Sequence, residues 1–122
     1  MAGTKQFEDL IAWQKARELA RAVYHATRQP AFGQDLGLKR QIQRASVSVM
    51  SNIAEGYERG SQKEFSRFLA ISKASCAEVR SLLYVAADAG YVPPPTFEDF
   101  MAKAEEASRI ISGLRTSVQQ HE

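Results

Sequence analysis

The residues from Arg44 to Val79 constrain the fold more than any other part of the chain. Two amphipathic helical patterns meet there at a corner that contains Gly56 and Gly60. The second pattern opens with Ser61, followed three residues later by Glu64, which is the spacing of a capping box. A capped corner between two helices predicts an αα-hairpin. We expect Gly56 to end the first helix of this hairpin in the left-handed conformation.

Apolar residues recur at helical spacing along the rest of the chain as well. Four helices are predicted, over residues 7–28, 36–56, 62–89 and 96–118. Pro30 and Gly33 break the pattern after the first helix, and three prolines follow Gly90 after the third. Asp35 and Thr96 are the predicted N-caps of the second and fourth helices. With connections this short, the predicted fold is all-α, an antiparallel up-down-up-down four-helix bundle that forms a single domain over residues 1–122.

The composition is that of an ordinary globular protein, with 44% hydrophobic and 25% charged residues. The longest stretches without a charge are far shorter than the ~18 to 20 apolar residues that span a bilayer. The first ten residues lack an apolar signal-peptide segment. We therefore expect a cytoplasmic protein with no membrane partner.

Residues that usually carry catalysis or bind metals are scarce. The chain has one cysteine, Cys76, and two histidines, His25 and His121, which excludes a zinc site of the Cys/His type. Neither histidine follows a glutamate by three residues, so the di-metal motif of bundle enzymes is absent too. No glycine-rich phosphate loop or nucleophile elbow occurs. We predict no catalytic residues, no metal and no cofactor, and we expect Cys76 to be a small core residue.

The basic residues are unevenly distributed, although the net charge is only +2. Cationic residues outnumber acidic ones between positions 36 and 80, within the central hairpin. Such a set is either a solvated face or a ridge that contacts phosphate groups. The residues that would form this ridge are Arg40, Arg44, Arg59, Lys63, Arg67, Lys73 and Arg80.

A line of polar residues lies beside the apolar stripe of the second helix. Ser48, Asn52, Glu55 and Arg59 follow one another at intervals of four, three and four residues. This line is either a solvated edge or a buried seam that forms hydrogen bonds with a neighbouring helix or subunit.

Several of these residues belong to a recognisable pattern. The run NIAEG at 52–56, followed by Arg59, Ser61 and the run EFSRFL at 64–69, resembles the proteins encoded in intervening sequences of 23S ribosomal RNA genes. FEDLIAWQKA at 7–16 extends the resemblance, which covers nearly the whole chain. These four-helix bundles are similar to the accessory protein of diversity-generating retroelements, a five-fold barrel whose basic surface binds nucleic acid and a reverse transcriptase. The resemblance implies a homo-oligomer, expected to be a pentamer, with RNA or DNA as a candidate partner.

Two functions remain open from the sequence. In the first, a ring repeats the modest basic ridge, and weak phosphate contacts add up through multivalency. In the second, the charged corner pairs with other copies or with a partner protein such as a reverse transcriptase, and the chain is a scaffold or accessory subunit without direct nucleic-acid contact. Here Asn52, Glu55, Arg59 and Arg67 would form subunit contacts, and Glu55→Ala would dissociate the oligomer.

Overall fold

The computed structural model describes residues 6–121, and every regular element in them is helical. This confirms the predicted all-α class. A short 3-10 helix, η1 (Phe7–Asp9), precedes α1 (Ile11–Thr27) and the single-turn helix α2 (Pro30–Gln34). Three long helices follow, α3 (Leu36–Glu58), α4 (Gln62–Asp88) and α5 (Pro94–Gln120).

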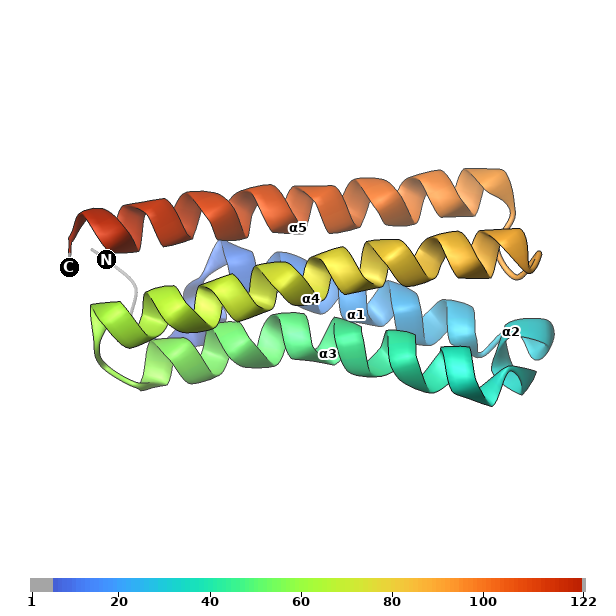
Figure 1. The fold of residues 1–122 in the computed structure, drawn as a ribbon, viewed down its shortest axis with the longest axis horizontal. Coiled ribbons are helices and arrows are strands. Elements are labelled where there is room, and N and C mark those ends of the chain that lie inside the picture. The colour runs from blue at the N-terminus through green and yellow to red at the C-terminus, as the bar shows by residue number, and fades with distance from the viewer. Residues whose placement is uncertain (1–5, 122) are drawn as a thin grey trace.

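The four longer helices lie side by side, and the chain reverses direction from each to the next (Figure 1). Helix α1 packs against α3 and α5, and α4 packs against the same two helices from the other side. Helices α3 and α5 are therefore diagonal to each other. One hydrophobic core fills the space between the four helices. Its largest fully buried side chains include Leu19, Val23, Ile42, Val49, Ile53, Leu69, Val79, Leu83 and Ile111.

Two of the predicted helix starts are correct. The Asp35 carboxylate accepts a hydrogen bond from the Leu38 amide at 3.2 Å and caps α3. The Ser61 hydroxyl accepts one from the Glu64 amide at 3.3 Å and caps α4. Both caps satisfy amides that the first helical turn leaves without a partner, so local sequence was sufficient to predict them.

Other predicted boundaries are wrong. Helix α5 begins at Pro94, with Pro93 as the N-cap residue, rather than after Thr96. Proline is tolerated in the first turn because the amide that it lacks would be unpaired there. For the same reason Pro30 starts the short helix α2, where the sequence indicated only a break.

The connections on either side of α2 and before α5 meet at one end of the molecule. The Phe32 and Tyr91 rings stack at 5.2 Å between centroids. The Tyr91 hydroxyl donates to an Asp35 carboxylate oxygen at 2.9 Å, and this hydrogen bond raises the pKa of Tyr91. The α1–α3 connection and the α4–α5 connection are therefore fastened to each other at the end opposite to the α3–α4 corner.

Candidate nucleic-acid interface

The α3–α4 corner depends on one close approach and one turn. Gly56 lies inside α3, contrary to the predicted left-handed cap, and a β-carbon there would stand 2.6 Å from the β-carbon of Phe68. Its missing side chain thus lets α4 pack closely against α3. The left-handed residue is Gly60, with φ of 75°, and it turns the chain toward Ser61.

Two of the predicted basic residues contact the same aromatic ring at this corner. The guanidinium carbon of Arg59 lies 4.9 Å from the centroid of the Phe68 ring, and that of Arg67 lies 5.0 Å from it. Both distances are typical of a cation–π contact. Arg59 comes from the end of α3 and Arg67 from the early turns of α4, so the corner brings together cations from both helices.

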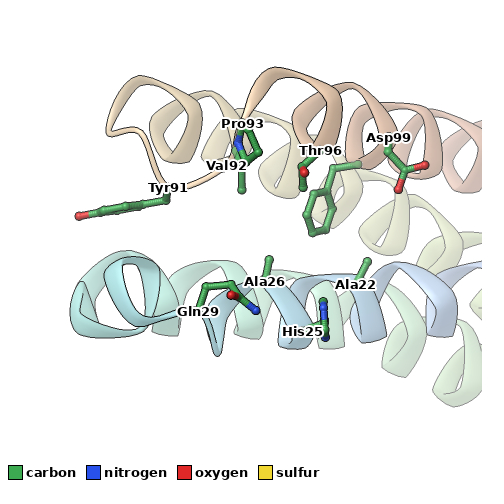
Figure 2. A pocket seen from close by; sticks show the side chains of 10 residues that line it. Ala22, His25, Ala26, Gln29, Tyr91, Val92, Pro93, Thr96 and Asp99 are labelled. Atoms are coloured by element: carbon green, nitrogen blue, oxygen red, sulfur yellow. The ribbon is translucent and has the colours of Figure 1, made fainter.

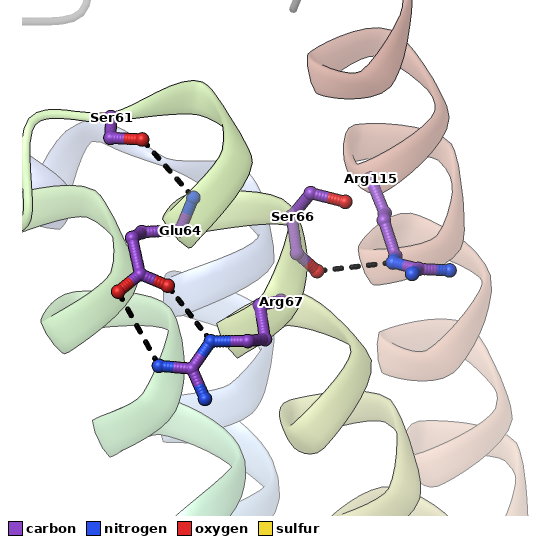
Figure 3. A network of polar contacts seen from close by, with 5 residues as sticks. All are labelled: Ser61, Glu64, Ser66, Arg67 and Arg115. Atoms are coloured by element: carbon purple, nitrogen blue, oxygen red, sulfur yellow. Dashed lines mark hydrogen bonds and ion pairs between the residues drawn. The ribbon is translucent and has the colours of Figure 1, made fainter.

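Arg67 is also held by a carboxylate. Its Nε donates to Glu64 at 2.8 Å, as Figure 3 shows. The pKa of Glu64 is lowered, chiefly by this hydrogen bond and also by the charges of Arg67, Arg59 and Lys63. Glu64 thus fixes the direction of the guanidinium while remaining ionised. Because the pair is exposed, it contributes more to orientation than to stability.

A groove between α4 and α5 lies beside Arg67. Its volume is about 590 Å³, and its lining includes Lys63, Arg67, Ala70 and Arg115. Arg115 extends from α5, and its Nε donates to the Ser66 carbonyl oxygen at 3.0 Å (Figure 3). Sequence reasoning missed Arg115 because only the register between α4 and α5 places it beside the corner. Its position next to the apolar stripe of α5 was the only signal available.

We call Arg59, Lys63, Arg67 and Arg115 the corner cluster. Three of these cations, Lys63, Arg67 and Arg115, line the groove together with a single carboxylate, that of Glu64. Within residues 6–121, Arg59 and Lys63 form no ion pair, so their charges are available to a ligand. Cations with such spacing suit phosphate oxygens, which accept the planar hydrogen-bond fork of arginine and the point charge of lysine.

The other predicted basic residues lie apart from this cluster. Arg40 and Arg44 are on the first half of α3, with Arg40 ~28 Å from Arg59 at the helical rise of 1.5 Å per residue. Lys73 is exposed farther along α4. An Nη of Arg80 lies 4.0 Å from a Glu105 oxygen on α5. The seven residues therefore do not form one continuous ridge.

The polar line on α3 has two halves with different surroundings. The Ser48 hydroxyl and the Ser75 hydroxyl of α4 share a hydrogen bond at 2.8 Å, and Asn52 Nδ2 donates to both the carbonyl and the hydroxyl oxygen of Ser48. These groups bind each other between two helices of one chain. Glu55 and Arg59, in contrast, are exposed.

A second hollow lies between α1 and the start of α5. It has a volume of about 440 Å³ and is lined in part by Ala22, His25 and Asp99. In Figure 2 the His25 imidazole and the Asp99 carboxylate do not point toward each other.

Within residues 6–121, no group of three or more His, Cys, Asp or Glu side chains could hold a metal ion. No helix in that part of the chain is long and apolar enough to cross a bilayer.

No curated protein matches the chain. A solved structure of similar fold is a protein of unknown function from the S23 ribosomal protein family of Bacteroides thetaiotaomicron. It is 20% identical, with a TM-score of 0.78, and the alignment covers 86% of this chain and 98% of that one. The family model of the 23S rRNA-intervening sequence proteins matches residues 8–113. This match confirms the resemblance seen at the corner, and the chain belongs to the 23S rRNA-intervening sequence protein family.

Proposed function

We propose that this chain is the protomer of a non-enzymatic, cytoplasmic homopentamer that binds structured RNA. In this proposal the chain is an antiparallel up-down-up-down four-helix bundle, and the ring repeats one basic surface in each copy. The corner cluster is the observation that supports it most directly. Four cationic side chains from α3, α4 and α5 gather at one corner, and three of them, Arg59, Lys63 and Arg115, have no ion-pair partner within residues 6–121.

The cluster is suited to phosphate groups rather than to base edges. Arg59 and Arg67 are held over Phe68, and Arg67 is oriented further by Glu64. Side chains that are already ordered lose less conformational freedom when they bind. The net charge of one chain is modest, so a single cluster would bind weakly, and repetition around a ring would raise the overall affinity.

The test is RNA binding as a function of salt, measured by fluorescence anisotropy with a labelled hairpin RNA. Lys63→Ala combined with Arg59→Ala should weaken binding of all hairpin sequences alike. It should also reduce the slope of log affinity against log salt by about 1 for each phosphate contact removed. Both side chains are exposed, so the fold should tolerate the change.

Arg21→Ala is the matched control, because Arg21 is an exposed arginine on α1 with no ion pair within residues 6–121. Its affinity for the hairpin should equal that of the wild type. If the wild type bound no RNA at low salt, or if the Arg21 and corner variants weakened binding equally, the proposed interface would be wrong.

A further inference from the structure

A second groove between α4 and α5 differs in character from the corner. It is lined by Tyr84, Phe97, Glu98, Met101, Ala102 and Glu105 and has a volume of about 380 Å³. The Tyr84 side chain is large, yet the residue is 55% exposed, and its ring meets Phe97 edge-on at 5.1 Å between centroids. Its neighbour Val85 is 49% exposed. Apolar surface of this kind beside a groove is typical of a contact surface.

The charges of this groove are negative. Glu98 and Glu105 are seven residues apart on α5, which places them on one side of the helix. Glu98 forms no ion pair within residues 6–121, and the contact from Glu105 to Arg80 is long, at 4.0 Å. Carboxylates beside an exposed aromatic ring suit an arginine, whose planar guanidinium can stack on the ring while it pairs with the carboxylate.

A matching surface exists elsewhere on the same chain. Leu36, Arg40, Arg44 and Val47 follow one another on α3 at intervals of four, four and three residues, so they share one side of the helix. Leu36 is 51% exposed and Val47 is 37% exposed. Neither arginine forms an ion pair within the described part of the chain. We call these four residues the α3 stripe.

The two surfaces are complementary in charge and in apolar character. The α3 stripe presents two arginines between two apolar side chains, and the groove presents two carboxylates beside the exposed Tyr84. Within one chain the arginines of the stripe do not pair with the two carboxylates of the groove, because α3 and α5 are diagonal in the bundle (Figure 1). A contact between them therefore requires two copies.

We propose that the α3 stripe of one copy docks into the Tyr84–Glu98 groove of the next copy. This inference rests on the self-association contained in the proposed function and names its interface. Because two unlike surfaces pair, the contact is head-to-tail, and repetition of it generates a closed ring or an open filament. The contact also assigns Arg40 and Arg44 to assembly and leaves the corner cluster free for RNA.

Charge reversal followed by light-scattering measurement of molar mass tests this assignment. Glu98→Lys with Glu105→Lys, and Arg40→Glu with Arg44→Glu, should each lower the mass to that of a single chain. Like charges would then face each other across the contact. The chain carrying all four substitutions should regain the wild-type mass, since its two surfaces are complementary again. Glu8→Lys, an exposed reversal on η1, should leave the mass unchanged.

Each outcome decides between this interface and self-association in general. A wild-type oligomer whose mass is unaffected by both reversals would overturn the interface and leave oligomerisation standing. A wild-type monomer would overturn both. Glu98 lies in the early turns of α5, so its reversal could weaken that helix. For that case Tyr84→Ala gives the same test: a folded variant of unchanged mass overturns the proposal. RNA binding is measured separately and depends on the corner cluster.

Discussion

At the scale of single residues, Cys76 shows how burial decides reactivity. The side chain is fully buried in the core, on the apolar face of α4, as its position in the stripe predicted. Burial raises the pKa of the thiol to about 11, and the nearby charge of Arg80 lowers it by less. The reactive thiolate is therefore almost absent at neutral pH.

We predict that a maleimide will not label Cys76 in the folded protein at about pH 7.5, whereas it will label the urea-unfolded chain stoichiometrically. The reason is that both access to the sulfur and ionisation of the thiol require the core to open. Mass spectrometry of a time course measures this directly. Rapid labelling without denaturant would show that the core around α4 is open in solution.

Single residues also show which features were predictable from the sequence. Asp35 and Ser61 were found because a cap is a contact between residues three apart. Gly56 and Arg115 were not, because their roles depend on residues far away in the sequence, Phe68 and Ser66. Arg59 and Arg67 were both selected as basic residues, yet nothing in the spacing indicated that they share one aromatic ring.

At the scale of elements, α3 and α4 share the most extensive contact of any helix pair in residues 6–121. The Ser72 hydroxyl of α4 donates to the Val49 carbonyl oxygen of α3 at 2.6 Å. The shared hydrogen bond between Ser48 and Ser75 lies nearby, and Gly56 completes the close approach toward the corner. Small residues allow this approach, and their hydroxyls satisfy each other or the backbone between the two helices.

We expect Gly56→Ala to destabilise the protein by about 1 to 3 kcal/mol, as overpacking of a core does. Alanine has the higher helix propensity, but its β-carbon would require the Phe68 backbone to move. The measurement is the free energy of unfolding in urea.

Gly113→Ala is the matched control, because Gly113 lies in α5 and a β-carbon added there would meet no neighbouring atom within 4 Å. It should stabilise the chain by about 0.5 to 1 kcal/mol through helix propensity alone. Equal effects of the two substitutions would show that the α3–α4 approach is not tight.

At the scale of the whole molecule, one ion pair links the first helix to the last. Lys15 Nζ on α1 lies 2.9 Å from a Glu106 oxygen on α5. The hydrogen bond between these two side chains is the main cause of two pKa shifts. It lowers the pKa of Glu106 and raises the pKa of Lys15. A lowered carboxylate pKa gives stability that is present at neutral pH and lost on acidification. A raised lysine pKa gives stability that is lost only in strong alkali.

We therefore predict that Glu106→Gln will lower stability between about pH 5 and pH 10, where both partners are charged. The difference from the wild type should disappear in acid, as the pH falls through the lowered pKa of Glu106, and in alkali, as it rises through the raised pKa of Lys15. Urea midpoints across this range measure it. Glu78→Gln, which removes an exposed carboxylate in the middle of α4 with no ion pair within residues 6–121, should show no such dependence. A constant Glu106 effect at all pH values would contradict the assignment.

The unequal lengths of the helices bear on how the molecule opens. Helix α1 begins beside Gly113 and Leu114, whereas α5 runs on to Gln120, so within residues 6–121 the last turns of α5 extend past the start of α1 at the corner end. The opposite end is fastened by Phe32, Tyr91 and Asp35. Thermal fluctuations that break backbone hydrogen bonds should therefore begin at the corner end, and amide protons there should exchange with solvent first. A ligand that bridges the corner cluster would suppress this local unfolding, so recognition and rigidity would increase together at the same place.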